Sequence, residues 1–379
     1  MKKKILLVVS LVFVGLVILT LISGQVARLL GVEPVCIQGD LTQLRLVPCS
    51  SLSGSTASNT INPLPTLSAE GPIPFIFDDD GSPDGLIALL YLLNHPTFEV
   101  RAVTVSCGEA HPDVFADHLS HFLAGLGHPD IPIGAGRETP LEGQNTFPEP
   151  WRQLSDRFWD LPLPQSKNQS NPQSATQLII DTLSESTKPM LVFLSGTHTN
   201  LAEALLLEPG IARQIKAVYI MGGSINRPGN IESDWSEIHN SVAEWNIWVD
   251  PVAARLVFNA GLPIYLVPLD ATNQVLWTNT DARHWDSSGT TSGKRAGEIL
   301  TWILDSWSTN NVYVWDLVAA ALATDPDLCP AVPLTVDVLV DPGPEQGRTV
   351  LVDGPSNATV CLEPDARKVK ERVGYILGQ

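Results

Sequence analysis

Basic residues are scarce in this chain. Among its 379 residues, Lys and Arg number 23 and Asp and Glu number 41, so the formal net charge is −18 at pH 7. Proteins that bind nucleic acid neutralise phosphates with Lys and Arg, so this balance argues against a polyphosphate partner and favours small neutral or cationic ligands. Hydrophobic residues make up 44% of the chain, which is enough to fill a sizeable core. We therefore expect a globular protein that does not bind nucleic acid.

Several common signals are also missing. We find no internal repeat, and no G-x-S-x-G elbow supports Ser195 as a nucleophile.

The N-terminal apolar run Ile5–Ile22 follows three lysines and has 18 uncharged residues. A membrane span needs roughly 17 to 25 such residues, whereas a cleaved signal has a shorter core and a small-x-small site that is not clear here. We expect residues 1–30 to be an uncleaved membrane anchor, with a cleaved signal as the alternative, and the remainder to be exported.

Cysteines are few as well, and their spacing suggests two bridges. The plausible pairs are Cys36 with Cys49 and Cys329 with Cys361, which leaves Cys107 as a buried thiol in an apolar strand, although the sequence does not prove this connectivity. Residues 31–72 are expected to form a cysteine-containing stalk and a Ser-, Thr- and Pro-rich linker. The remaining residues, 73–379, are expected to form one catalytic domain.

Short apolar runs alternate with amphipathic ones in that domain. The expected strands are Pro74–Phe77, Val100–Cys107, Ile131–Gly134, Met190–Leu194, Ala217–Met221 and Ile264–Pro268. The expected helices include Asp84–Asn94, Pro112–Leu126, Ala175–Ser184 and Asn200–Leu207. This alternation predicts an α/β fold: a Rossmann-like, open, largely parallel sheet with helices on both faces.

An acidic turn follows the first of these strands, in the stretch "PFIFDDDGSPDGLIALLYLL". Its four acids are Asp78, Asp79, Asp80 and Asp84. Like charges this close repel each other, so a cation or the hydroxyls of a substrate would have to lie among them. The alternative is a solvated loop in which Asp84 merely favours the first turn of a helix. In either case the helix is expected to start with Ser82 as N-cap and Pro83 at its first position. The turn lies at the carboxyl end of a strand, where ligands bind in parallel sheets.

Polar clusters follow other predicted strands too: "CGEAHPD", "SGTHTN", "MGGSINRPGN" and "PLDATNQ". The stretches "SVAEWNIWVDPVAAR" and "NVYVWDLVAAAL" place Glu244, Asn246 and Asp316 in apolar surroundings. Buried polar groups are costly without partners, so these residues are expected to face a site.

This ordered set resembles the inosine-uridine preferring nucleoside hydrolases, which are calcium-dependent enzymes that cleave the N-glycosidic bond of ribonucleosides. The hallmark of that family is a D-x-D-P-G-x-D-D turn before an apolar helix, and Asp78, Asp80 and Asp84 match its first three acids. The stretches "IPIGAGRETPL", "SGTHTNLAEAL", "YIMGGSI", "AEWNIWVDP", "VPLDATNQV" and "WDLVAAAL" follow in the family's order. The resemblance extends from Pro74 to the C-terminus and implies a hydrolase that releases ribose and a free base.

The resemblance also implies roles for individual residues. It makes Asp80 a calcium ligand and the base that accepts a proton from the attacking water, and it adds Asp316 and the backbone carbonyl of Thr199 to the calcium shell. Residues that would hold the ribose hydroxyls are Asp84, Asn230, Glu244 and Asn246, with Asn240 as a rival for the role of Asn230. Calcium prefers oxygen ligands, and carboxylates near the sugar favour the positive charge that develops as the glycosidic bond breaks.

The chain departs from the family pattern around the metal. Gly85 stands where the family has its fourth acid, another calcium ligand. Glu109 replaces the Asn of the family's "GN" pair, so we expect it to supply the missing carboxylate, and Asp79 is a second candidate. A nucleoside is the expected ligand, and assembly into a homo-oligomer is left open.

A second departure concerns the leaving base. Trp315 replaces the histidine that assists purine departure in some members of the family. Its indole N–H does not titrate near neutral pH, so Trp315 is expected to stack on the base, as Trp245 could, but not to act as a general acid. His239 and Tyr313 are candidate substitutes for that acid.

Two other functions compete with this interpretation. "FIFDDDGS" also looks like the nucleophile turn of haloacid-dehalogenase phosphatases, but a convincing downstream lysine with paired acids is missing. A non-catalytic nucleoside- or sugar-binding protein on the same scaffold is the stronger alternative, because Gly85 and Trp315 depart from the family. The histidines His111, His118 and His121 look like a metal cluster, but His118 and His121 fall on a helical stretch and are more consistent with surface or half-buried residues.

Overall fold

The computed structural model describes residues 35–38, 45–48, 71–163 and 172–378. The chain forms two units, Met1–Thr60 and Ile61–Gln379. In the first unit, strands β1 (Val35–Gln38) and β2 (Arg45–Pro48) pair in antiparallel fashion. The expected membrane anchor and nearly all of the expected linker lie outside the described residues. Within the described part of the chain, no helix combines the length and the apolar character that crossing a bilayer requires.

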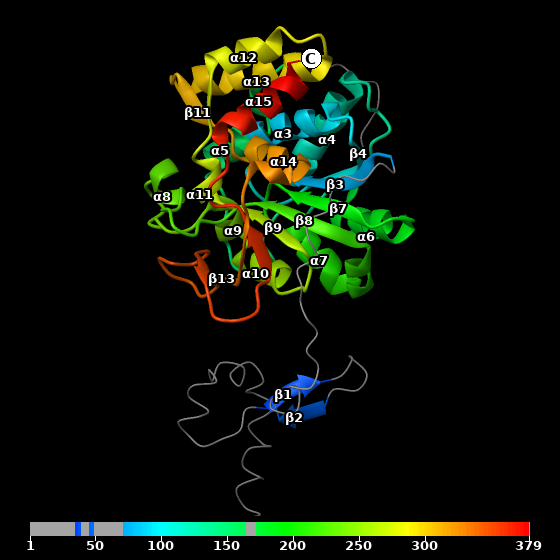
Figure 1. Cartoon of the computed structure of the whole chain (residues 1–379), viewed down its shortest axis with the longest axis vertical. Helices are drawn as coiled ribbons and strands as arrows, with labels where there is room; N and C mark the ends of the chain where they lie inside the picture. The colour runs from blue at the N-terminus through cyan, green and yellow to red at the C-terminus, as the bar shows by residue number, and fades with distance from the viewer. Residues whose placement is uncertain (1–34, 39–44, 49–70, 164–171, 379) are drawn as a thin grey trace, which may run out of the picture. The chain divides into compact units, whose positions relative to one another are not determined.

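The second unit is built on a nine-stranded sheet (Figure 1), in the order β12-β15-β9-β8-β7-β3-β4-β5-β6. Neighbouring strands are parallel except β12 and β15, which are antiparallel. In chain order the strands are β3 (Ile73–Asp79), β4 (Phe98–Val105), β5 (Ile133–Ala135), β6 (Gln173–Ser174), β7 (Met190–Leu194), β8 (Ile215–Met221), β9 (Ile264–Val267), β12 (Val332–Leu334) and β15 (Ala358–Val360). The expected α/β fold with a largely parallel sheet is confirmed.

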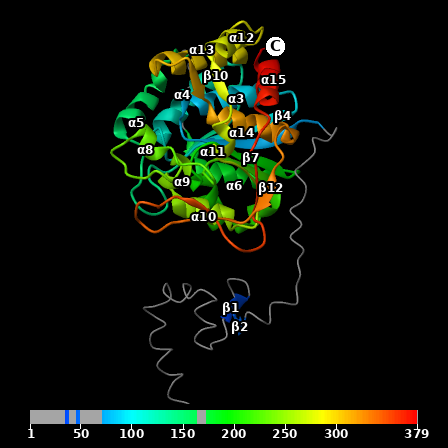
Figure 2. The same ribbon diagram turned by 60° about the vertical axis from the view of Figure 1, so that its left-hand side comes forward.

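Helices cover both faces of the sheet, as Figures 1 and 2 show. One face carries α3 (Pro83–Asn94), α4 (Pro112–Gly125), α12 (Asn279–Asp286), α13 (Thr291–Ser306), α14 (Trp315–Thr324) and α15 (Ala366–Leu377). The other carries α6 (Ala175–Glu185), α7 (Thr199–Leu207) and α10 (Pro251–Phe258). Strand side chains alternate between the two cores: Phe75 and Phe77 of β3 pack on the first, and Ile76 packs on the second. The expected helices are all present.

Shorter elements lie at the ends of these strands and helices. The helical ones are α5 (Glu149–Ser155), η2 (Phe158–Asp160), η3 (Pro209–Gln214), α8 (Ile231–Asp234), α9 (Trp245–Val249), α11 (Leu269–Thr272) and η4 (Pro326–Leu328). The small strands pair in antiparallel fashion as β10 (Leu276–Thr278) with β11 (Asn311–Tyr313) and β13 (Val336–Val338) with β14 (Thr349–Leu351). Several of these elements build the walls of the cleft described below.

The cysteines follow the expected pattern where they are described. Cys329 and Cys361 form a disulfide that links the end of η4 to the end of β15. Cys107 is a buried free thiol, as expected. The expected partner of Cys36, Cys49, lies outside the described residues, so that pairing stays a prediction.

Candidate active site

The acidic turn after β3 is buried. Asp78, Asp79, Asp80 and Asp84 are exposed by only 0%, 1%, 2% and 8%. A solvated loop would leave these carboxylates in water, so that interpretation of the turn is wrong. Ser82 caps α3 as expected, because its Oγ accepts the N–H of Gly85 at 2.9 Å.

The start of α14 meets the same turn from a distant part of the sequence. Ser82 Oγ donates to Asp316 Oδ2 at 3.1 Å, and the backbone N–H of Asp316 donates to Asp84 Oδ2 at 3.2 Å. Asp80 Oδ2 accepts the backbone N–H of Glu109 at 3.4 Å. Three segments of chain therefore converge on one buried group of acids.

Burial and mutual repulsion disfavour the charged forms of these acids. Burial, followed by repulsion from Asp79 and Asp84, raises the pKa of Asp80 well above its ordinary value. Burial and repulsion from the same neighbours raise the pKa of Asp316 in the same way. For Glu109, burial and the nearby Asp80 are the leading causes of a strongly raised pKa. These groups would gain from a cation among them.

A cleft of about 330 Å³ opens beside the acids. Eight of the nine predicted site residues line it: Asp80, Asp84, Glu109, Asn230, Glu244, Asn246, Trp315 and Asp316. The ninth, Thr199, is buried at the start of α7, where its Oγ1 donates to Asp250 Oδ2 at 2.7 Å. The structure thus brings together residues that are up to 236 positions apart in the sequence, from Asp80 to Asp316.

Glu244 and Asn246 are held at fixed positions on one side of the cleft. Glu244 caps α9 by accepting the N–H groups of Asn246 at 3.0 Å and Ile247 at 3.3 Å, and it also accepts the N–H of Gly223 at 2.9 Å. Asn246 Nδ2 donates to the carbonyl of Ser195 at 3.0 Å. Burial nevertheless raises the pKa of Glu244 to about 7.

Asn230 and Asn240 can now be distinguished. Asn230 lines the cleft, and its Oδ1 is a buried atom without a hydrogen-bond partner in the described structure. Asn240 uses its Oδ1 to accept the N–H of Ala243 at 3.0 Å and its Nδ2 to donate to the carbonyl of Gln346 at 2.8 Å. Asn240 is thus committed to holding its own loop, and Asn230 is the better candidate for a ligand.

Aromatic side chains also line this cleft. These residues are Phe147, Trp151, Trp159, Trp245, Trp307 and Trp315. Phe147 stacks on Trp245 with ring centroids 4.5 Å apart, and Trp151 lies 5.6 Å from Trp245. We call this set the aromatic wall. Sequence reasoning singled out only Trp245 and Trp315 and missed the rest, which come from segments without a motif.

The segment that carries Trp151 and Trp159 is hydrogen-bonded to the acidic turn, and we call this attachment the clasp. Trp159 Nε1 and Ser155 Oγ both donate to the carbonyl of Gly81, at 3.0 and 2.6 Å. Phe158, Trp159 and Asp160 have φ values of 54°, 56° and 53°, in a region that side chains seldom adopt. The strain of these residues is tolerated because the surrounding hydrogen bonds fix the turn.

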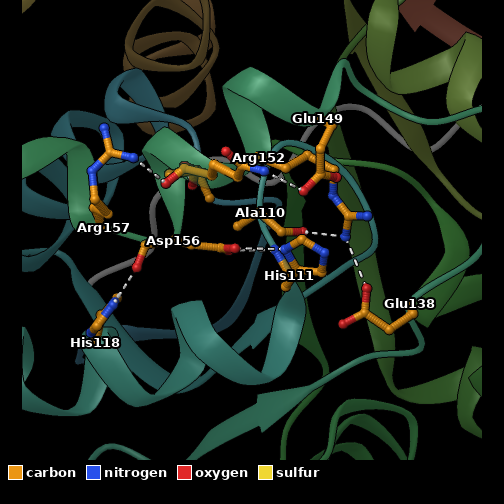
Figure 3. Close-up of polar contacts among 11 residues, drawn as sticks. Ala110, His111, His118, Glu138, Glu149, Arg152, Asp156 and Arg157 are labelled. Atoms are coloured by element: carbon orange, nitrogen blue, oxygen red, sulfur yellow. Dashed lines mark hydrogen bonds and ion pairs between the residues drawn. The ribbon is translucent and has the colours of Figure 1, made fainter.

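Histidines complete that clasp (Figure 3). His111 Nδ1 lies 2.7 Å from Asp156 Oδ2, and His118 Nε2 lies 2.7 Å from the carbonyl of Asp156. Arg152 donates to the carbonyl of Ala110 at 3.1 Å. His111 and His118 therefore hold α5 and η2 against α4, and both are half-buried.

The candidate acids for the leaving base lie elsewhere than expected. His239 is exposed, 3.5 Å from Glu232, and Tyr313 stacks beside Trp315 without lining the cleft. Trp315 Nε1 is engaged by Asn273 Oδ1 at 2.8 Å. Sequence reasoning missed Asp234, which lines the cleft at the end of α8 and accepts the indole N–H of Trp245 at 3.2 Å. Its only signal was an acid next to Trp235, in the stretch between Asn230 and Glu244.

The chain is similar to known proteins in its sequence. A profile of the family described as inosine-uridine preferring nucleoside hydrolase matches residues 75–371. The chain belongs to this family. The pyrimidine-specific ribonucleoside hydrolase RihA of Citrobacter koseri is 30% identical over 304 residues, which span 77% of this chain and 94% of the relative. RihA of Enterobacter sp. strain 638 is 29% identical over 318 residues, which span 81% and 98%.

Solved nucleoside hydrolases share the fold. A plant nucleoside hydrolase, PpNRh1, superimposes with a TM-score of 0.71 at 25% identity, covering 81% of this chain and 99% of its own. A purine-preferring ribonucleoside hydrolase from Gardnerella vaginalis gives 0.70 at 25% identity, with 80% and 99% covered. The nucleoside hydrolase described here is therefore an enzyme, and the phosphatase and non-catalytic binding alternatives are not supported.

Proposed function

We propose that this nucleoside hydrolase cleaves the N-glycosidic bond of ribonucleosides to ribose and free base, with a calcium-held water that Asp80 deprotonates. One observation carries the proposal. A single cleft joins the buried acids Asp80 and Asp316 to the ribose-binding candidates Asp84, Glu244 and Asn246, and the aromatic wall lines the same cleft. This is the arrangement that a flat base attached to a polyhydroxylated sugar requires.

The donors in the cleft suit a hard cation. Asp80, Asp316 and Glu109 offer only oxygen, and their repulsion would be relieved by a divalent ion. Within the described residues, no group of three or more His, Cys, Asp or Glu side chains is placed so that it could hold a metal ion by itself. Backbone carbonyls, such as that of Thr199, and water would thus complete the shell. Calcium bound there would supply a fixed water of lowered pKa.

Asp80 is the proposed general base. Its carboxylate is buried at the end of β3 and lines the cleft, so it can reach a water that is held beside the sugar. As the glycosidic bond breaks, positive charge develops on the ribose, and the negative charge of Asp84 and Glu244 favours that state. Their oxygens would also accept hydrogen bonds from the ribose hydroxyls, while Asn230 and Asn246 supply amide groups.

Ribonucleosides as a class are the proposed substrates. RihA of Citrobacter koseri is named for pyrimidine nucleosides and the Gardnerella vaginalis enzyme for purine ones, so the family accommodates both. The aromatic wall offers ring faces such as those of Trp151 and Trp245, on which either kind of base can stack.

We also propose that the enzyme acts outside the cytoplasm. The disulfide between Cys329 and Cys361 supports an oxidising compartment, and the apolar run Ile5–Ile22 supports membrane anchoring or export. Assembly into a homo-oligomer stays a prediction.

The test is release of reducing sugar from inosine, uridine, cytidine and adenosine, measured with calcium, with chelator, and with chelator followed by excess calcium. We expect ribose to appear with calcium, to cease with chelator and to return on calcium addition. Tight nucleoside binding without ribose release under all three conditions would instead favour a binding protein. Chelator-resistant turnover would refute the metal requirement and leave the reaction standing.

A further inference from the structure

Gly85 and Asp79 compete for one small space beneath the first turn of α3. A Cβ atom built on Gly85 would lie 1.9 Å from Asp79 Oδ1 and 2.8 Å from Asp79 Cγ. Real Cβ contacts essentially never fall below about 3 Å, so a side chain at position 85 would force the carboxylate of Asp79 out of the position that it has here. A glycine weakens a helix, but here its lack of a side chain is what admits Asp79.

Asp79 reaches this space from the sheet. Its Oδ1 accepts Ser195 Oγ at 3.0 Å, and its Oδ2 accepts the N–H of Gly81 at 3.0 Å. The preceding acid, Asp78, points to the opposite face of the sheet, where its Oδ1 accepts Asn200 Nδ2 of α7 at 3.0 Å. Strand alternation therefore sends Asp79 alone to the α3 side.

The negative charge of the Asp79 carboxylate acts on the proposed metal ligands. It repels the carboxylates of Asp80, Asp316 and Glu109 strongly enough to be among the causes of their raised pKa values. Its own hydrogen-bond donors, Ser195 and Gly81, are neutral, so they leave its negative charge uncompensated. A buried carboxylate in this position calls for a cation.

We propose that Asp79, from strand β3, supplies the carboxylate that a side chain at position 85 of α3 cannot supply. The inference rests on the proposed function and adds a ligand to its metal. Compared with the family pattern, the acid is then on the strand at position 79 instead of on the helix at position 85, and Gly85 leaves room for it. We call this replacement the exchange. Glu109, whose backbone N–H donates to Asp80, is left free for a lesser role.

The experiment compares calcium affinity by calorimetry and the calcium-induced rise in Tm for the full chain and its variants. Asp79→Asn should weaken calcium binding at least ~10-fold, because a charged ligand is lost. Gly85→Asp alone should also weaken binding, because the new side chain displaces Asp79. The double change Asp79→Ala with Gly85→Asp should bind calcium more tightly than Asp79→Ala does. Asp78→Asn, an equally buried acid on the other face, is the matched control and should bind like the parent.

The outcomes separate the two proposals. If the parent binds calcium and releases ribose but Asp79→Asn binds calcium equally well, only the role of Asp79 fails. A folded double variant that binds no better than Asp79→Ala would also overturn the exchange. If the parent binds no calcium, the metal of the proposed function and this inference fall together. Melting curves without calcium, taken for every variant, show whether a loss of affinity reflects unfolding.

Discussion

The two walls of the cleft are built in different ways. The acidic wall comes from the ends of neighbouring strands: Asp80 follows β3, Glu109 follows β4, and Asn246 is anchored between the ends of β7 and β8. Much of the aromatic wall comes from short elements outside the sheet: Trp151 lies on α5, Trp159 on η2 and Trp245 on α9, the helix that also carries Asn246. The sheet itself thus positions the chemistry, whereas loops that can vary surround the base.

This difference predicts a division of labour. Groups placed by strand ends are rigid and should control the rate of bond cleavage. Groups placed by loops should control which base is held and how it leaves. Substitutions in the two walls should therefore change different kinetic constants.

The largest effect is expected in the acidic wall. Asp80→Asn removes the proton acceptor and one charge next to the metal, so kcat should fall about 10³-fold or more while the Tm stays near that of the parent. Initial rates of ribose release from inosine and uridine measure this. A variant that retains near-normal turnover would remove Asp80 from its role as base.

A substantial effect is expected from Asp234, which would act as the general acid that protonates the leaving base. Asp234 accepts the indole N–H of Trp245, a residue of the aromatic wall. Asp234 is an exposed residue, and partial desolvation of its carboxyl raises its pKa to about 6, so the carboxyl is largely protonated below that pH and loses its proton as pH rises through it. Glu109 and Glu244 interact electrostatically with Asp234, and their negative charges would favour the protonated form of the Asp234 carboxyl. Asp234→Asn should reduce kcat/KM for inosine roughly 10²-fold at pH 5.5 and abolish the decline above pH 6.

The matched control is a 4-nitrophenyl riboside, whose leaving group needs no proton. Its cleavage should be much faster than that of inosine at neutral pH and nearly unchanged in Asp234→Asn. An equal loss on both substrates would mean that Asp234 only supports the fold of α8 and the position of Trp245.

A smaller effect is expected from the ring faces. Trp151→Ala should raise KM about 10-fold for nucleosides and change kcat little, because stacking holds the base before and during cleavage alike. Trp151→Phe is the control that keeps a ring and should recover most of the affinity. A large fall in kcat with KM unchanged would instead place Trp151 in activation of the leaving group.

The smallest effect is expected from Glu109. Glu109→Gln should raise the calcium concentration for half-maximal activity by a few-fold, since the carboxylate repels Asp80 and stabilises a nearby cation without being the nearest donor in our proposal. Titration of activity with calcium measures the shift. A shift as large as that of Asp79→Asn would make Glu109 an equal ligand.

The acidic wall was predictable from the sequence, whereas of the aromatic wall only Trp245 and Trp315 were. Parallel strands place their carboxyl ends at one edge, so polar residues after successive strands could be grouped without a structure. Phe147 and Trp151 carry no comparable signal, because an aromatic residue in a loop looks like ordinary core. The burial of Asp79 beneath Gly85 was equally hidden, since it depends on the distance between a strand and a helix. Sequence could name Asp79 as a candidate but could not choose it over Glu109.

The disulfide between Cys329 and Cys361 has a consequence for chain entropy. The bridge spans a sequence separation of 32 residues, and cross-linking a loop of that size removes conformations from the unfolded chain worth roughly 3 to 4 kcal/mol. Cys329 follows α14 closely in the chain, and Asp316 lies in the first turn of that helix. Reduction would therefore lower the cost of unfolding of the whole domain while changing no group in the cleft. Material produced in a reducing cytoplasm should then be catalytically normal when folded but shorter-lived on heating than the oxidised enzyme.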